Sequence, residues 1–584
     1  MLLLGAGGGE ATCGILYLAG YLRRHGVEAY VQLCDDEEIR EGWSERLAAL
    51  VARVRPRLVG ISLKWFHHVA RALHVARTVR AIDPEVRIVL GGNTASYFWR
   101  ELATHDCVDG VALGDGEVPL LSLCRGEDPP PNVVTRASTG AGRHAPPLAY
   151  VQGASSRDVH YSHFDDIFLS QLDLHSFSGW VAPGKGCGEN CLYCSGTRGM
   201  QKATFGRADP FLRPEESVRA DHREVVPRTW QLRYDFAGST PEFLERAWSE
   251  VDLSRHATTY FLWGVPPPGL AATLARRFQR AYMVLDIGCF SEQQRQEQMA
   301  RGLLKPCPSD RQLLEVIEDC RRHRNLELEI SGIAGLPFAS ARTLEQERRL
   351  VERVLGLGCT VGYQRLEAQP GALVTEHPER FGMVTEARTF QEFLDYFEQL
   401  GPGQRTVPMV RYRDPELEDA VQRTSDEVDA MVWEHAARRS RVAVNGRTRL
   451  LNVSASTRRF ELGEWLGRHR SPGRVAREPV TVVRSANGTG VTCAPSLSRR
   501  RFSDPALQQG EEGSALLEVL AAFERPTAVD AALARLRSRS RVSPELAREA
   551  IDQLAAGRFL QPADEAAGSE RPRPWRPAAS PSVH

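Results

Sequence analysis

The sequence predicts an α/β fold with an N-terminal doubly wound, Rossmann-like domain, a (βα) partial barrel and a small α+β winged-helix-like C-terminal domain. Short apolar runs alternate with amphipathic helices over residues 1–125, which predicts the first domain. The same alternation resumes after a Pro- and Gly-rich stretch, and residues 514–563 read as three short helices and an apolar strand. The 584 residues are 42% apolar and 25% charged, which is enough to build several hydrophobic cores.

The first domain is expected at residues 1–130. The apolar runs predict parallel strands, and the segments between them have the 3.6-residue period of helices. The expected elements are strands at 1–4, 27–33, 58–63, 86–90 and 108–113, with helices at 14–25, closed by Gly26, and 69–82. Residues 126–150 are rich in Pro, Gly, Ser and Thr without periodicity, so we place a linker at 131–160.

The second domain is expected at residues 161–425. Its predicted strands are 230–236, 260–263, 283–288, 326–333 and 360–366, and one of the intervening helices spans 344–357. Five or six βα repeats predict a full or partial barrel, whose chemistry lies at the carboxyl ends of the strands. Polar residues on the later strands are candidates for facing the interior and positioning a substrate: Glu327, Glu329, Tyr363, Arg365 and Glu367.

The signal is weaker beyond residue 425. A mixed, Arg-rich extension is expected at 426–512 and a winged-helix-like module at 513–565. Within that module, Ser543 followed by Pro544 predicts a helix start, and Gly557 predicts its end. The Pro-, Ser- and Ala-rich residues 566–584 are expected to be a disordered tail.

Composition excludes several classes of partner. The 74 Lys and Arg residues balance the 74 Asp and Glu residues, so nothing in the net charge indicates a nucleic acid partner. The sequence has neither a signal peptide pattern nor a run approaching the roughly 18 apolar residues of a membrane span. We therefore expect a cytoplasmic protein with no membrane partner, whose twelve cysteines are thiols.

The most specific motif is CxxxCxxC, formed by Cys187, Cys191 and Cys194. Three thiolates within eight residues can converge on one centre, and such soft ligands select an iron-sulfur cluster or zinc. A structural zinc site uses four ligands, usually as two pairs, and no second CxxC or HxxxH lies nearby. Three protein ligands leave one coordination position open.

With Tyr193 just before its last cysteine, this motif resembles that of the radical SAM superfamily. The resemblance implies that the three cysteines bind a 4Fe-4S cluster whose fourth iron chelates S-adenosylmethionine. Further turns resemble the cofactor-binding turns of that superfamily, although Ala237 and Ser239 replace a glycine and an acid. The residues that the resemblance assigns to S-adenosylmethionine are Tyr193, Ala237, Gly238, Ser239, Asp286, Ser291 and Gly335.

A doubly wound domain ahead of such a barrel resembles the cobalamin-binding (class B) radical SAM enzymes. Gly91 to Ala95 looks like the GGxxA turn of that family, and Gly114 to Glu117 looks like its GEGE turn. The DxHxxG motif that supplies an axial histidine is absent from the sequence, so cobalt is expected without protein imidazole. The residues assigned to cobalamin are Gly7, Gly8, Ser62, Lys64, Trp65, Gly91, Gly92, Ala95, Gly114 and Glu117.

The resemblance implies C-methylation of an unactivated carbon in a natural-product intermediate, with electrons from a flavodoxin- or ferredoxin-like donor. Alternatives with the same cofactors are a cyclase or rearrangement enzyme, polar methyl transfer by cobalt, and a peptide (RiPP) maturase that uses the C-terminal module. A cobalamin or cluster sensor without turnover is the alternative from another class. The substrate is expected to be a small molecule or a peptide.

Overall fold

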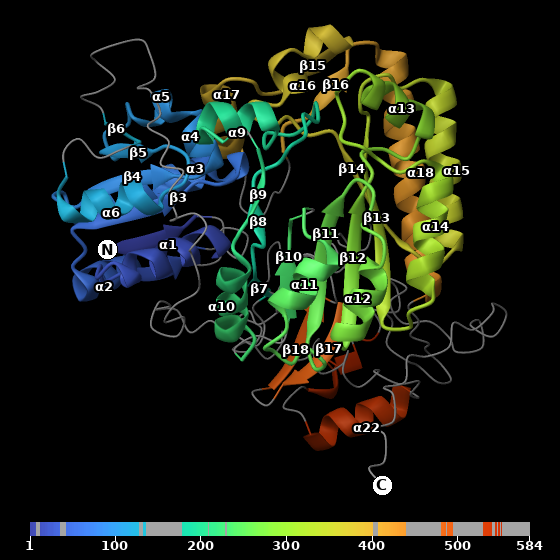
Figure 1. The fold of residues 1–584 in the computed structure, drawn as a ribbon, viewed down its shortest axis with the longest axis horizontal. Helices are drawn as coiled ribbons and strands as arrows, with labels where there is room; N and C mark the ends of the chain where they lie inside the picture. The colour runs from blue at the N-terminus through green and yellow to red at the C-terminus, as the bar shows by residue number, and fades with distance from the viewer. Residues whose placement is uncertain are drawn as a thin grey trace.

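The computed structural model describes residues 1–6, 12–34, 43–127, 132–135, 178–207, 209–227, 231–236, 238–400, 407–439, 480–485, 488–493, 529–539, 543–545, 547–548 and 551. Two mostly parallel sheets dominate it, one near the N-terminus and one in the middle of the chain (Figure 1). The hairpin of β8 (Gly184–Lys185) and β9 (Phe211–Leu212) runs between them. No helix in these ranges is long and apolar enough to cross a membrane.

The first sheet has six strands in the order β2-β1-β3-β4-β5-β6. The first five are parallel, as predicted, and this is the 2-1-3-4-5 order of a doubly wound domain. The strands are β1 (Leu2–Gly5), β2 (Tyr30–Leu33), β3 (Leu58–Ser62), β4 (Arg87–Gly91), β5 (Gly110–Ala112) and β6 (Val133–Thr135). Because β6 pairs antiparallel with β5, the first domain extends to residue 135 and the predicted linker begins too early.

Helices cover both faces of this sheet. Leu3 of β1 belongs to the apolar core that contains α1 and α6, whereas Leu2 and Leu4 belong to the core that contains α2 and α3. This alternation follows from the two-residue period of a strand. The helices are α1 (Thr12–Arg24), α2 (Trp43–Val54), η2 (Phe66–His68), α3 (Val69–Ile82), α4 (Asn93–Tyr97), α5 (Trp99–Leu102) and α6 (Glu117–Arg125).

The second sheet has six parallel strands in the order β14-β13-β12-β11-β10-β7. They are β7 (Ser178–Trp180), β10 (Gln231–Tyr234), β11 (Ala257–Trp263), β12 (Arg280–Asp286), β13 (Leu326–Ala334) and β14 (Thr360–Arg365). Five of these strands lie within a few residues of their predicted positions. Strand β7 was not predicted, because its three residues include a glycine and have no measurable period.

Helices cover the outer face of the second sheet. Met283 and Leu285 of β12 and Leu328 of β13 face these helices, so Tyr282, Asp286 and Glu329 face the opposite, inner side. The helices of this domain are α9 (Arg198–Phe205), α10 (Glu215–Val225), α11 (Pro241–Ala247), α12 (Leu270–Arg277), α13 (Glu292–Ala300), α14 (Asp310–Arg321), α15 (Ala341–Gly356) and α18 (Pro415–Arg439). Helix α18 continues through residue 425, where the domain was predicted to end.

A late segment of the second domain packs on the first. It comprises α16 (Leu373–Glu376), η5 (Pro378–Phe381), the antiparallel pair β15 (Met383–Thr385) and β16 (Val410–Tyr412), and α17 (Phe390–Gln399). The ring centres of Phe390 and Phe98 are 5.3 Å apart, and those of Phe393 and Phe66 are 5.5 Å apart. Helix α17 lies beside the first domain (Figure 1). It therefore joins the two domains through buried aromatic contacts.

A buried polar triad joins the domains elsewhere. Tyr17 of α1 donates a 2.8 Å hydrogen bond to Asp221 of α10, and Arg213 donates a 2.6 Å bond to the same carboxylate oxygen. Arg213 also donates to the carbonyl of Ala182, at 2.9 Å. The Arg213 and Asp221 side chains are 1% and 0% exposed, so this ion pair depends on domain contact to exclude water.

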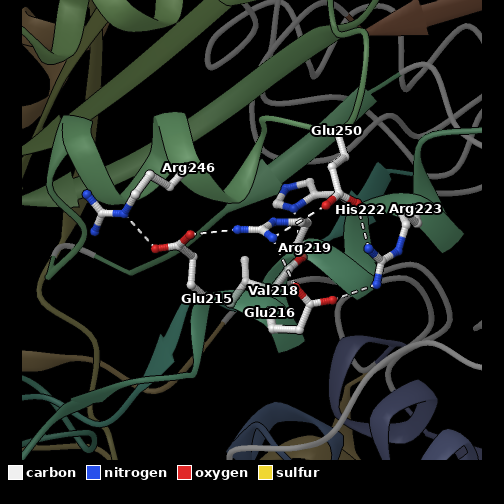
Figure 2. A network of polar contacts seen from close by, with 8 residues as sticks. All are labelled: Glu215, Glu216, Val218, Arg219, His222, Arg223, Arg246 and Glu250. Atoms are coloured by element: carbon white, nitrogen blue, oxygen red, sulfur yellow. Dashed lines mark hydrogen bonds and ion pairs between the residues drawn. The ribbon is translucent and has the colours of Figure 1, made fainter.

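Helix α10 also carries a surface network. Figure 2 shows Arg219 between Glu215 and Glu216, while Arg223 reaches Glu216 and Glu250. Arg246 of α11 bonds to Glu215 at 2.6 Å. Most of these groups are solvent-exposed, and such pairs contribute only about 0–1 kcal/mol each. The network connects α10 with the neighbouring α11.

Little of the C-terminal region is described. It contains a hairpin of β17 (Val480–Ser485) and β18 (Gly488–Cys493) and helix α22 (Val529–Arg539). The amide of Ala547 donates a 2.9 Å bond to the carbonyl of Ser543, as expected for a helix that begins there. Gly557, the tail and most of the winged-helix-like module lie outside the described residues.

Candidate functional site

The three cysteines lie on the loop between β8 and α9. Three separate segments hold this loop by hydrogen bonds. The Leu192 amide donates to Leu303 at 2.8 Å, and the Val374 amide donates to the carbonyl of Leu192 at 3.0 Å. The Ser195 amide donates to the side chain of Gln369 at 3.1 Å. The loop is therefore fixed by residues that follow β12 and β14, at the carboxyl ends of the second sheet.

The three thiols are partly buried, and two of them accept hydrogen bonds from backbone amides. Cys191 is buried, and Cys187 and Cys194 are half-buried. The amide of Lys305 donates to the Cys191 sulfur at 3.3 Å, and the amide of Gly196 donates to the Cys194 sulfur at 3.2 Å. Burial raises the pKa of all three thiols, that of Cys194 to about 12. A bound cation would be needed to hold them as thiolates.

The donor set fits a cluster better than zinc. Within the described ranges, no three His, Cys, Asp or Glu side chains are arranged to hold a single metal ion. A mononuclear zinc site would need each sulfur about 2.3 Å from one ion, with a fourth protein ligand in a structural site. In a 4Fe-4S cluster the thiolates bind different irons, so they need not share one ion. The three thiols, two of which accept hydrogen bonds from backbone amides, therefore fit a cluster, in which each thiolate binds its own iron.

A buried lysine borders the cysteine loop. The ammonium of Lys305 lies 2.6 Å from a carboxylate oxygen of Asp286 and 3.1 Å from the Tyr193 hydroxyl. Burial lowers the pKa of Lys305, but the neighbouring acidic groups of Asp286, Cys307 and Cys191 outweigh this effect, and the pKa is raised. Sequence reasoning missed Lys305, because it lies in a loop between α13 and α14 that matches no motif. Tyr193 lies on the cysteine loop and Asp286 lies beside it, and their predicted contacts with S-adenosylmethionine remain predictions.

The other residues assigned to S-adenosylmethionine are placed differently. Ser291 is the N-cap of α13, where its hydroxyl accepts from the Gln294 amide and donates to Gln346. Gly335 follows the last residue of β13 with φ at +79°, and a side chain there would lie 3.1 Å from Val421. Both residues therefore have structural roles that explain them without a ligand. Their cofactor contacts remain predictions.

The turn after β10 contains one buried hydroxyl. Ser239 is buried beside the hydroxyl of Tyr260, and neither hydroxyl forms a well-aligned hydrogen bond among the described residues. Gly238 is exposed, and Ala237 lies outside the described residues. An unsatisfied buried hydroxyl has a free-energy cost, which a bound polar ligand would remove. Contact of Ser239 with a cofactor remains a prediction.

Aromatic and cationic side chains line the inner carboxyl edge of the second sheet. The guanidinium of Arg233 on β10 lies 4.0 Å from the ring centre of Trp180 and 4.6 Å from that of Phe261. Its Nε also bonds to Asp235 at 3.0 Å. From the first domain, the ammonium of Lys64 lies 4.9 Å from the ring centre of Trp180. The carboxyl ends of β3 and β7 therefore meet here.

Five polar residues were predicted to face the interior of the second domain. Two of them point outward, and a third lies beyond the end of its strand. Tyr363 donates to Glu347 of α15, and Arg365 bonds to Glu418 of α18, so both point outward to the helices. Because successive side chains of a strand face opposite sides, Tyr363 and Arg365 share the outer face of β14 and not the inner face that was predicted. Glu367 lies beyond β14, in an isolated bridge with Met409. Glu327 and Glu329 do face inward, where they pair with Arg280 and Tyr282 on β12.

The glycines assigned to cobalamin contact protein in this structure. Gly92 has φ at +114°, and a side chain there would lie 2.7 Å from the carbonyl oxygen of Leu63. A side chain at Gly114 would lie 3.3 Å from Phe205 of α9. Gly91 has ordinary clearance, Ala95 is buried, and Ser62 ends β3. Gly7 and Gly8 lie outside the described residues. Close backbone packing thus explains Gly92 and Gly114 without a ligand.

The second assigned turn is an ion-pair site between domains. Glu117 and Asp115 both accept hydrogen bonds from Lys185 of β8, at 3.0 Å and 3.4 Å. Arg207 donates to Asp115 at 2.7 Å. Burial raises the pKa of Asp115, but the charges of Lys185 and Arg207 outweigh it, and the pKa is lowered. No local pattern could have identified Lys185 and Arg207, because their partners are about 70 to 90 residues away.

Comparison with known proteins identifies the first domain. Residues 2–123 match the family model of the B12 binding domain. No curated protein matches the whole sequence significantly.

Solved structures extend the comparison to the second domain. TsrM from Kitasatospora setae, a radical S-adenosylmethionine methyltransferase with cobalamin and a 4Fe-4S cluster bound, aligns at a TM-score of 0.57 with 15% identity, over 74% of this chain and 90% of its own. The structure of TsrM with tryptophan substrate and a SAM analogue aligns at 0.56 with 14% identity, over 74% and 88%. The chain has a B12-binding domain and the fold of a cobalamin-binding radical SAM enzyme, which confirms the resemblance at the level of fold.

Proposed function

We propose that this chain is a cobalamin-dependent radical SAM enzyme, and that it transfers a methyl group to an unactivated carbon of a natural-product intermediate. One observation carries the proposal. The carboxyl edge of the B12-binding sheet meets the carboxyl edge of the second sheet at Lys64 and Trp180. Ligands bind at these edges in both kinds of fold, so the two cofactors and a substrate would share one space.

The residues present would hold the implied groups as follows. Cys187, Cys191 and Cys194 would bind three irons of a 4Fe-4S cluster and leave the fourth open to S-adenosylmethionine. Ser239, whose hydroxyl is buried, would be a polar contact for that cofactor. When bound, the cluster and S-adenosylmethionine supply one-electron cleavage of a carbon–sulfur bond, and cobalamin supplies a methyl carrier.

The inner face of the second sheet supports a planar, largely apolar substrate. Trp180, Phe261 and Trp263 lie half-buried at its carboxyl edge, with Arg233 between two of the rings. Such rings would exclude water and hold a flat substrate by stacking. TsrM has been solved with tryptophan as substrate, which is consistent with this chemistry. Arg233 would orient a polar substituent of the substrate.

The decisive experiment is an anaerobic assay of the full-length protein. It is reconstituted with iron, sulfide and cobalamin, supplied with S-adenosylmethionine and either dithionite or a reduced flavodoxin, and assayed for S-adenosylhomocysteine and deoxyadenosine. Release of S-adenosylhomocysteine, with a mass increase of one methyl group in a bound substrate, supports C-methylation. Deoxyadenosine without methyl transfer would instead indicate a cyclase or rearrangement enzyme. Binding of cobalamin with neither product would indicate a sensor.

The peptide maturase alternative makes a separate prediction. The C-terminal module would then hold a leader peptide, and removal of residues 513–584 would abolish turnover while cobalamin and iron contents stay unchanged. Unchanged kinetics of the truncated protein on a small-molecule substrate would contradict that alternative.

A further inference from the structure

Lys305 connects the cysteine loop to a buried charge. Its backbone amide bonds to the Cys191 sulfur at 3.3 Å, and its side chain is 5% exposed. The ammonium is enclosed by the Asp286 carboxylate at 2.6 Å and the Tyr193 hydroxyl at 3.1 Å. Lys305 thus contacts the loop through its main chain at Cys191 and through its ammonium at Tyr193, which lies between Cys191 and Cys194.

The two charges of the ion pair between Lys305 and Asp286 are screened by solvent to different extents. The Asp286 side chain is 35% exposed, and its oxygen also accepts a 2.8 Å hydrogen bond from the Gly288 amide. Solvent and that amide weaken the field of the carboxylate, whereas the enclosed ammonium is screened much less. The ammonium of Lys305 is therefore the less screened of the two charges beside the cysteine loop.

We propose that Lys305 is a positioning residue that sets the reduction potential of the iron-sulfur cluster held by this loop, by stabilising its reduced state. The inference rests on the proposed function. A low-potential one-electron donor, such as reduced flavodoxin, passes one electron to the cluster. No bond forms or breaks in that step, and the cluster gains one negative charge. Net charge and hydrogen bonds to the sulfurs tune such potentials, and Lys305 supplies both.

Substitutions of Lys305 and of Asp286 are expected to shift the reduction potential of the cluster in opposite directions. Lys305→Met removes the cation and leaves Asp286 unpaired, so reduction becomes less favourable and the potential falls. Asp286→Asn keeps a nearly identical shape and the bond from Gly288, but it leaves the cation uncompensated, so the potential rises. We expect each shift to be at least about tenfold in the equilibrium constant for one-electron reduction, which is about 59 mV. A purely structural role would not give opposite signs.

The measurement is a redox titration of the full-length protein reconstituted with iron and sulfide alone, followed by EPR and visible absorbance. Lys202→Met is the matched control, because Lys202 is an exposed lysine on the neighbouring helix α9. Its potential should equal that of the wild type. Lys305→Arg keeps the charge and should stay close to the wild type.

The outcomes separate this inference from the proposed function. Shifts of the same sign in Lys305→Met and Asp286→Asn, or shifts no larger than in the control, would overturn the inference. Lys305→Met could lose its iron and so give no potential. In that case the reduction potential of Asp286→Asn must still rise above that of the wild type, and the potential of Lys305→Arg must still equal it, or the inference fails. Iron content is measured first, and a wild-type protein that binds no cluster would sink the proposed function itself.

Discussion

The ammonium of Lys64 lies 4.9 Å from the ring centre of Trp180, and the guanidinium of Arg233 lies 4.0 Å from the same ring. Lys64 follows strand β3 of the B12-binding domain, whereas Trp180 ends β7 and Arg233 lies on β10 of the second sheet. One indole ring therefore contacts cations from both domains. This contact places the Trp180 ring at the junction where we propose that cobalamin and substrate meet.

Trp180→Leu is expected to reduce turnover at least about tenfold while cobalamin and iron contents stay unchanged. The substitution removes two cation–π contacts, each worth about 0.5–2 kcal/mol, and the flat surface for stacking. The rate of product formation at saturating S-adenosylmethionine measures turnover. Metal analysis measures the cobalt and iron contents. Trp99→Leu, on α5 of the first domain, is the control, and its turnover should stay near that of the wild type. Equal losses in both variants would contradict a local role for Trp180.

Cys191→Ala is expected to remove the bound iron and all cleavage of S-adenosylmethionine, with cobalamin retained. Two thiols cannot replace the three that the cluster would require. The measurements are iron and cobalt per chain after anaerobic reconstitution. Cys320→Ala changes a buried cysteine on α14 and should keep its iron. Normal iron in Cys191→Ala would show that the loop does not hold the cluster.

Arg213→Met is expected to destabilise the protein by about 3–5 kcal/mol, because it removes the cation that balances the charge of the buried Asp221 carboxylate. Arg219→Met is the matched control, since Arg219 belongs to the surface network of Figure 2 and its loss should cost about 1 kcal/mol or less. Urea unfolding followed by tryptophan fluorescence compares the two. Similar losses in both variants would mean that the interface does not hold the domains by this ion pair.

Glu347→Gln is expected to change how stability depends on pH. Burial raises the pKa of Glu347 from 4.5 to about 7, although the bond from Tyr363 acts in the opposite direction. The folded state then holds a proton that the unfolded state releases, so this group's contribution is complete below pH 4.5 and is lost as the pH rises toward 7.

The free energy of unfolding of Glu347→Gln, relative to the wild type, should therefore increase between about pH 4.5 and pH 7, by on the order of 3 kcal/mol. Taking the difference between the two proteins cancels other titrating groups, including the buried His222. Urea unfolding at five pH values measures it. A difference that does not vary with pH would show that Glu347 is not protonated in the folded state at neutral pH.

Local patterns in the sequence determined much of this protein. The periods of apolar residues predicted five strands of each sheet and the bounds of α3, because strand and helix periods depend only on neighbouring residues. The cysteine spacing likewise identified the loop, since three thiols so close in the chain need no distant partner to be found. Asp286 and Tyr193, which the sequence assigned to S-adenosylmethionine, both bond to Lys305 at that loop.

Only the tertiary structure decided which partners the polar groups take. Lys305 lies 112 residues from Tyr193, Lys185 lies 68 residues from Glu117, and Tyr17 lies 204 residues from Asp221. Such pairs form because domain packing excludes water between side chains that are distant in sequence. The local periodicity of the sequence therefore cannot predict them. The outward faces of Tyr363 and Arg365 have the same cause, because helices α15 and α18 offered them carboxylates. The sequence alone thus specified the strands and the cysteine loop, and packing specified the charges around them.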